Sequence, residues 1–237
     1  MTTKMTIAIW SDMMCPFCFI GKKNLDVALA QFPDRDNITI EWHSYQLAPD
    51  FYPKAGKNAH EVLAEYKGVS IEEAQQMNAY VTQVAARSGI TFDMDRMQWA
   101  NTFAAHRLLQ FAKQYQLGAQ LEQRLFEAVF CNGEDVGSLS KLEAIAAEIG
   151  LPTKETHAVL NSTAYTEEVR QDIRQSHSMG LRGVPFFLID NKMTFSGAVK
   201  PVDFLQVITE SFTNWKAENP QSISFDGESC SIDGICE

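Results

Sequence analysis

The feature that most constrains this chain is a pair of cysteines, Cys15 and Cys18, separated by two residues. Residues 5–10 form a short apolar run with two β-branched isoleucines, which is typical of a buried strand. Residues 16–30 carry apolar side chains at helical spacing, and Pro16 suits the first turn of a helix. A dithiol between a strand and a helix indicates a redox-active pair.

The expected helix explains why the two thiols would differ. Its first turn leaves backbone N–H groups without partners, and the helix dipole adds positive potential there. This end stabilises a thiolate at Cys15, which predicts that Cys15 attacks a disulfide. Cys18 lies one turn further along the helix and is placed to resolve the mixed disulfide. A zinc site would need two further ligands, and the sequence predicts no metal.

A second signal is Gly183-Val184-Pro185, directly before an apolar strand. Proline cannot donate a hydrogen bond to a sheet, so its place at a strand start indicates a special bend. A trans bond is the ordinary state of an isolated X–Pro pair. Together with the dithiol, however, the pattern predicts a cis bond at Pro185. The backbone of Val184 would then be free to bind an extended substrate.

The order of elements predicts an α/β fold with an all-helical insertion. A strand, a helix and a second strand at 38–45 are followed by helical patterns from 58 to 178. A hairpin at 184–196 and a helix at 202–215 complete the chain's pattern. We therefore expect one domain from residues 1–57 and 179–218, an inserted helical domain at 58–178, and a flexible tail at 219–237. Five helices are expected in the insertion, at 72–88, 101–115, 120–130, 139–149 and 163–179. The charged stretch 167–172 is expected to be a solvated helix face.

Charge and hydropathy exclude several partners. The formal net charge is −10, whereas a nucleic-acid-binding protein needs a basic patch. No apolar run is long enough for a membrane span. The apolar run at the N-terminus is too short for a signal peptide, which predicts a cytoplasmic protein. Nothing in the sequence indicates an oligomeric state.

The tail carries a second cysteine pair, Cys230 and Cys236, with a glycine between them. A disulfide across this short loop is sterically easy. We expect it to act as an accessory redox pair that exchanges electrons with Cys15 and Cys18. An adventitious or metal-binding tail is the alternative.

These motifs resemble the DsbA-like thioredoxin-fold oxidoreductases of the FrnE type, which are related to 2-hydroxychromene-2-carboxylate isomerase and to kappa-class glutathione transferases. The resemblance extends along nearly the whole chain. It is carried by residues 12–21, 45–50, 101–107, 125–130, 180–187 and 195–198. It implies a thioredoxin domain with a helical insertion, in agreement with the pattern of elements.

The resemblance also implies roles for single residues. Cys15 would be the nucleophile, Cys18 the resolving thiol and Pro185 the cis-proline, with Val184 as the backbone contact. Asn101 and His106 would lie at the head of an inserted helix and bind substrate. A hydrogen-bonded helix histidine is the simpler role for His106.

The sequence thus predicts a protein disulfide oxidoreductase or isomerase that acts on protein or peptide thiols and disulfides. It needs no cofactor, although glutathione could serve as a co-substrate. Two other functions stay open. One is a glutathione-dependent isomerase or transferase, although that branch carries a serine at the position of Cys15. The other is a redox-inert chaperone that binds peptides beside Pro185. Asp12 would cap the helix, form a turn or relay protons.

Overall fold

The computed structural model describes residues 4–52 and 56–219. Four strands and nine α-helices are found in this part of the chain. The strands are β1 (Met5–Ser11), β2 (Ile38–Ser44), β3 (Phe186–Ile189) and β4 (Met193–Ser196). The helices are α1 (Pro16–Gln31), α2 (Ala59–Lys67), α3 (Ile71–Arg87), α4 (Phe103–Lys113), α5 (Gly118–Phe130), α6 (Leu139–Glu148), α7 (Thr153–Leu160), α8 (Thr166–Ser178) and α9 (Pro201–Glu218).

The strands form one sheet in the order β2-β1-β3-β4. β1 and β2 are parallel, as expected for two strands joined by a helix, and β3 runs antiparallel to β1. β3 and β4 form the expected hairpin, whose turn residues Asp190 and Asn191 both have positive φ. β1 therefore lies inside the sheet and is buried along almost its whole length. Its carboxyl end leads directly into Cys15.

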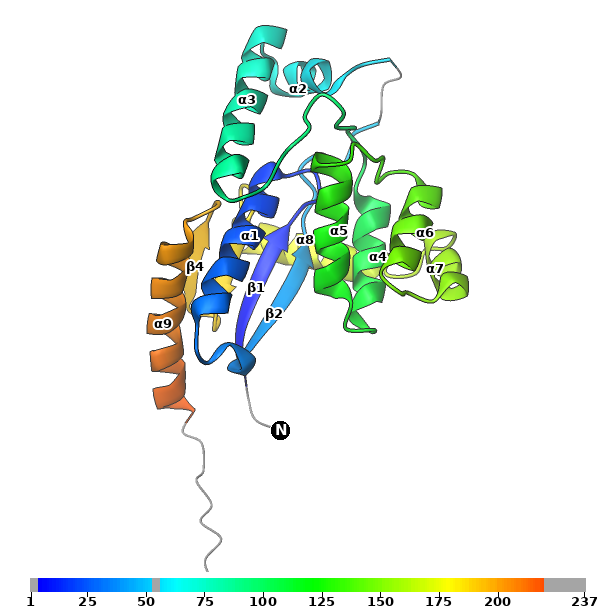
Figure 1. The fold of residues 1–237 in the computed structure, drawn as a ribbon. Coiled ribbons are helices and arrows are strands. Elements are labelled where there is room, and N and C mark those ends of the chain that lie inside the picture. The colour runs from blue at the N-terminus through cyan, green and yellow to red at the C-terminus, as the bar shows by residue number, and fades with distance from the viewer. Residues whose placement is uncertain (1–3, 53–55, 220–237) are drawn as a thin grey trace, which may run out of the picture.

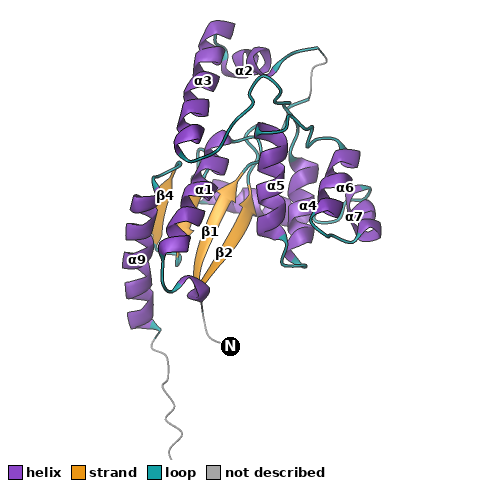
Figure 2. Cartoon of the chain, viewed as in Figure 1, coloured by secondary structure: helices purple, strands orange, loops and turns teal. Residues whose placement is uncertain are grey.

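Helices cover both faces of the sheet (Figures 1 and 2). α1 and α9 pack against each other on one face, while α8 crosses behind the strands and contacts β2. The remaining helices lie beyond the end and edge of the sheet, with α2 and α3 in one group and α4 to α7 in another. The predicted α/β fold with a helical insertion is confirmed.

The insertion contains two helices, α2 and α7, that are not among the five predicted from the sequence. Both are short, with nine and eight residues. The apolar residues Ala59, Val62 and Leu63 of α2 do follow helical spacing, but they span little more than one turn. The expected boundary at residues 178 and 179 stays a prediction, although α8, on the inserted side of it, lies against the sheet.

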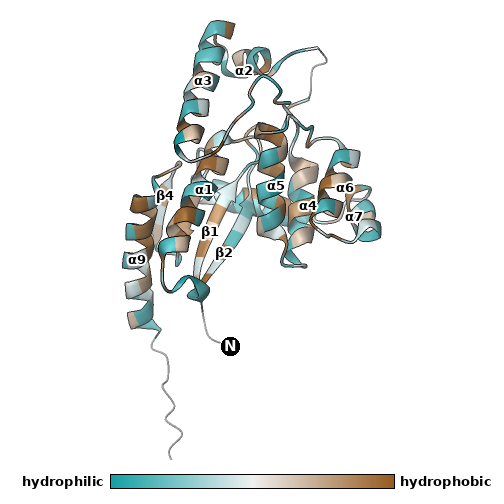
Figure 3. Cartoon of the chain, in the orientation of Figure 1, coloured by the Kyte–Doolittle hydropathy of each residue, from teal (hydrophilic) through white to brown (hydrophobic). Residues whose placement is uncertain are grey.

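One large core joins the sheet to most of the inserted helices. Figure 3 shows hydrophobic residues gathered on β1, α1 and α9. The contact between α1 and α5 is aromatic, because Phe19 stacks on Phe126 with ring centroids 5.1 Å apart. This contact fixes α5 beside the start of α1, where the two cysteines lie.

Candidate active site

Cys15 and Cys18 lie at the start of α1, as the sequence indicated. Cys15 is the residue at the helix N-cap, and Pro16 occupies the first turn. Both thiols are free and buried, with exposed fractions of 4% and 1%. The N–H of Cys18 donates to the carbonyl of Cys15 (3.0 Å), so the dithiol is held within one turn.

The second half of the site comes from the loop before β3. The Val184–Pro185 bond is cis, and the Cys15 thiol donates to the carbonyl oxygen of Val184 across 3.4 Å. The N–H of Val184 has no backbone partner among the residues that the structure describes. Residues about 170 positions apart in the chain thus meet at one sulfur atom.

Gly21 allows this close approach of the loop to α1. A Cβ atom at that position would lie 3.3 Å from Pro185 Cγ and 3.3 Å from Phe187 Cζ. A side chain there would be in tight contact with both residues, which would have to shift by a few tenths of an ångström. The glycine therefore favours the close packing of the two halves of the site.

The environment of Cys18 keeps its thiol protonated. Burial raises the pKa of Cys18 well above its usual value, and the hydrogen bond and charge of Cys15 raise it further. Hydrogen bonding from the Asp12 backbone, and to a lesser degree from the Ser11 hydroxyl at the end of β1, acts in the opposite direction and lowers the pKa of Cys18. A base is therefore needed before Cys18 can attack.

A buried carboxyl group contacts the end of β1, close before the dithiol in the chain. Glu122 on α5 is fully buried, and its Oε1 accepts a hydrogen bond from Ser11 Oγ (2.8 Å). Its other oxygen, Oε2, has no hydrogen-bond partner among the described residues. Burial raises the pKa of Glu122, against the opposing effects of the Ser11 hydrogen bond and the positive charges of His106 and Lys22.

Asp12 forms the turn that leads into α1. Its Oδ1 accepts from the N–H of Met14 (3.2 Å), and its Oδ2 accepts from the N–H of Leu47 (2.7 Å). Its carbonyl accepts from the N–H of Cys15 (2.9 Å). No side chain caps α1, so Asp12 acts here as a turn residue that ties the dithiol to residue 47.

The structure separates the two candidate substrate residues from the surface near Cys15. His106 is 1% exposed, its Nε2 lies 3.7 Å from Asp12 Oδ1, and neither ring nitrogen has a hydrogen-bond partner among the described residues. Asn101 donates to the carbonyl of Pro49 (2.8 Å) and accepts from the N–H of Phe103 (3.0 Å). Both side chains contact neighbouring parts of the protein in this structure. Their role in substrate binding stays a prediction.

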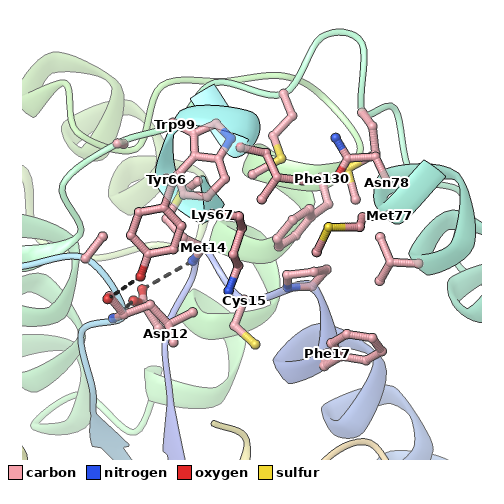
Figure 4. Close-up of a pocket in the computed structure, with 18 of the residues that line it drawn as sticks. Asp12, Met14, Cys15, Phe17, Tyr66, Lys67, Met77, Asn78, Trp99 and Phe130 are labelled. Atoms are coloured by element: carbon pink, nitrogen blue, oxygen red, sulfur yellow. Dashed lines mark hydrogen bonds between the residues drawn. The ribbon is translucent and has the colours of Figure 1, made fainter. Parts of the chain in front are cut away.

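A cavity of about 280 Å³ opens beside Cys15 (Figure 4). Its walls come from the start of α1 and from α2, α3, the segment 94–102 and the end of α5. Sequence patterns do not indicate this cavity, because it depends on how α2 and α3 lie over the dithiol. A shallower depression flanks the proline loop, lined by residues 179–186 with Ser196 and Gly197.

Two of the residues missed by sequence reasoning could have been found. Glu122 precedes Phe126 by four residues and Val129 by seven, so helical spacing puts it on their buried face. Ser11 directly follows the apolar run of the first strand. A polar residue in either position is unusual and indicates a functional or structural hydrogen bond.

Three further expectations concern the tail cysteines, a metal site and a membrane span. Cys230 and Cys236 fall outside the described residues. Within the described ranges, no group of three or more His, Cys, Asp or Glu side chains could hold a metal ion. No helix in this part of the chain has both the length and the apolar character of a membrane span.

Known proteins share this architecture. The chain is 25% identical over 199 residues to the uncharacterized protein YwbO of Bacillus subtilis. This alignment covers 83% of this chain and 92% of YwbO. A structure from Streptomyces coelicolor, described as a probable DsbA oxidoreductase, superimposes with a TM-score of 0.83 at 32% identity, over 98% of each chain.

More distant structures share the fold alone. A 2-hydroxychromene-2-carboxylate isomerase aligns with a TM-score of 0.65 at 16% identity, over 91% of this chain and 98% of that one. The cytosolic disulfide reductase DsbM of Pseudomonas aeruginosa aligns with a TM-score of 0.64 at 15% identity, over 88% of this chain and 99% of DsbM.

The family model that describes a DSBA-like thioredoxin domain matches residues 6–209, which include the dithiol, the cis-proline and the whole helical insertion. The chain belongs to the DSBA-like thioredoxin domain family.

Proposed function

We propose that this protein is a thiol–disulfide oxidoreductase of the FrnE type that acts on protein or peptide substrates in the cytoplasm. One observation carries the proposal: a dithiol opens α1, and the first of its sulfurs contacts the carbonyl of the residue before a cis-proline. A helix N-terminus favours a thiolate, and the free backbone N–H of Val184 suits an extended substrate chain.

In the reductive direction the reaction has two exchange steps. The Cys15 thiolate attacks one sulfur of the substrate disulfide, which breaks that bond and releases the first substrate thiolate. The Cys18 thiolate then attacks Cys15 Sγ, which releases the second substrate thiolate and leaves a Cys15–Cys18 disulfide. Two electrons pass to the substrate, and a dithiol reductant returns the protein to its starting state. Oxidation of a substrate dithiol is the same sequence in reverse.

The buried groups supply the base for the second step. While Cys18 is a thiol, Ser11 donates its proton to Glu122, and its oxygen can accept the proton of Cys18. Once Cys18 is a thiolate, the hydroxyl donates to its sulfur, in keeping with the lowering effect of Ser11 on the pKa of Cys18. As Cys18 attacks, its proton passes to Ser11 Oγ and the Ser11 proton passes to Glu122 Oε1. A carboxyl group whose pKa is raised by burial is a stronger base than an ordinary glutamate, which suits this exchange.

The dithiol mechanism is tested by single cysteine variants in the reduction of a peptide disulfide by dithiothreitol. Cys15→Ser should abolish catalysis. Cys18→Ser, reduced beforehand and mixed with the peptide disulfide in the absence of dithiothreitol, should accumulate a mixed disulfide at Cys15, detected by intact mass. Cys131→Ser is the matched control, because Cys131 is half-buried and lies at the end of α5, and it should keep the full rate.

Two outcomes would contradict the proposal. Full turnover by Cys18→Ser would favour a one-thiol isomerase or transferase that uses glutathione. A native protein that does not accelerate the reduction beyond dithiothreitol alone would favour a redox-inert peptide-binding protein.

A further inference from the structure

The cavity beside Cys15 is apolar on almost every side. Aromatic residues such as Trp99 and Phe130 line it together with four methionines, Met14, Met77, Met94 and Met97. The flexible side chains of methionine adapt to differently shaped partners. At about 280 Å³ the cavity has room for one large side chain. The reactive sulfur belongs to its wall, so a substrate that reacts at Cys15 lies at its mouth.

The charged groups of the wall are not equivalent. The carboxylate oxygens of Asp12 accept the N–H groups of Met14 and Leu47, so this charge is engaged within the protein. The ammonium group of Lys67, at the end of α2, instead points into the opening beside Cys15 (Figure 4). Lys67 is exposed, and its ammonium group lies 5.3 Å from the centre of the Tyr66 ring. A substrate therefore meets an apolar wall with a single positive group at its rim.

We propose that this cavity binds one bulky apolar side chain of a protein or peptide substrate, adjacent to the cysteine that exchanges with Cys15, and that Lys67 pairs with an acidic group beside it. The inference rests on the proposed function and names its substrate class. The exchanging cysteine sits at Cys15, the neighbouring side chain enters the cavity, and the chain continues along Val184 and Pro185 into the shallower depression.

Glutathione is the informative comparison. It carries the same reactive sulfur but no apolar side chain, so it can react at Cys15 without filling the cavity. Its exchange should be independent of the apolar part of the cavity wall. A difference between a peptide and glutathione disulfide therefore isolates the contribution of the cavity.

The first test compares two peptide disulfides that differ only in the residue next to cysteine, tryptophan or serine. Burying an aromatic side chain should raise kcat/KM for the tryptophan peptide by roughly tenfold. Met77→Gln, on the cavity wall, should reduce this ratio several-fold and leave glutathione disulfide unaffected. Tyr80→Gln is the matched control, since Tyr80 lies on the same helix, is 60% exposed and does not line the cavity.

A second comparison isolates the charge. Peptides carrying glutamate or glutamine beside the tryptophan are measured at one ionic strength with the native protein and with Lys67→Gln. The ratio of the glutamate to the glutamine peptide should fall by about two- to fivefold in Lys67→Gln. An unchanged ratio would overturn the role of Lys67.

Binding of the tryptophan side chain can also be observed directly, by NMR, without a substitution in the cavity wall. Cys18→Ser traps the tryptophan peptide on Cys15, and methyl-labelled methionine should then show contacts between the indole and the methyls of Met77, Met94 and Met97. Equal rates for the tryptophan and serine peptides, with no such contacts, would overturn the inference while leaving the dithiol mechanism intact. Failure of both peptides and of glutathione disulfide to exchange would overturn the proposed function itself.

Discussion

The carboxyl group of Glu122 on α5 accepts a hydrogen bond from Ser11 and is fully buried from solvent. Such a group costs folding free energy when it is ionised. The protein keeps it although a glutamine could accept the same hydrogen bond from Ser11. A proton-transfer role for Glu122 explains why an ionisable group, rather than an amide, stands there.

Glu122→Gln should slow the second exchange step by about a hundredfold, because the amide cannot take the proton that Cys18 must lose. The first step, attack by Cys15, should keep its rate. Quenched-flow measurement of mixed-disulfide decay across pH 5–9 separates the two steps. The decay in the variant should follow hydroxide concentration over the whole range. An unchanged pH profile for this decay would contradict the proton-transfer role.

The same substitution has a predictable effect on stability. Burial raises the pKa of Glu122 in the folded protein, so the native state loses stability as pH rises from below the ordinary glutamate range through the raised value. Above that window Glu122→Gln should have the higher free energy of unfolding, and below it the two proteins should converge. Urea unfolding at pH 4 and pH 8 measures this, with the exposed Glu210→Gln as a control that should change neither value.

At the scale of elements, one buried carboxylate joins α8 to the sheet and to α4. Asp172 accepts from the backbone N–H of Ser44 on β2 (2.8 Å) and from Gln110 on α4 (2.6 Å), and it pairs with His43 (2.8 Å). The expectation that residues 167–172 form a solvated face holds for Glu167 but is wrong for Asp172, which is 8% exposed. Helical spacing from the buried Val169 puts Asp172 on the inner side.

Asp172→Asn should lower the free energy of unfolding by about 1–3 kcal/mol at neutral pH, because the charge that binds three elements is lost. Burial opposes ionisation of Asp172, yet the hydrogen bond and charge of His43 and the N–H of Ser44 lower its pKa overall. This stabilisation is present above the ordinary aspartate pKa and is lost as pH falls through the lowered value. The difference between native and variant should therefore shrink below about pH 4. Glu168→Gln, exposed on the same helix, is the control, and an equal loss in it would contradict the assignment.

The sequence was most informative where local rules determine structure. The strand, dithiol and helix around Cys15 follow from periodicity and a proline at the helix start, and the proline loop follows from one motif. The cavity and the position of Lys67 follow instead from the way α2 and α3 pack over α1. Such packing depends on many weak contacts between distant segments, which periodicity does not encode.

At the scale of the whole molecule, the net charge of −10 acts on every charged substrate. Glutathione disulfide is an anion, so the overall field slows its encounter with the protein. Raising the ionic strength from about 20 to 200 mM shortens the range of this field to about 10 Å or less. The rate of exchange with glutathione disulfide should then rise by roughly two- to fivefold.

Stopped-flow measurement of kcat/KM against NaCl concentration checks this prediction. A neutral peptide disulfide is the control and should show no trend. A fall in the rate for glutathione disulfide would mean that the local positive group, Lys67, outweighs the net charge of the molecule.

The order of the site's parts along the chain has a consequence for biosynthesis. About 165 residues separate Cys18 from Pro185, and the strand that completes the site comes after the whole helical insertion. At a ribosomal speed of about 5–20 residues per second, roughly 10–30 s pass between synthesis of the two halves. During that time the nascent chain carries both thiols without the loop that later covers them. Newly made protein is therefore most open to unwanted thiol chemistry before its last quarter has left the ribosome.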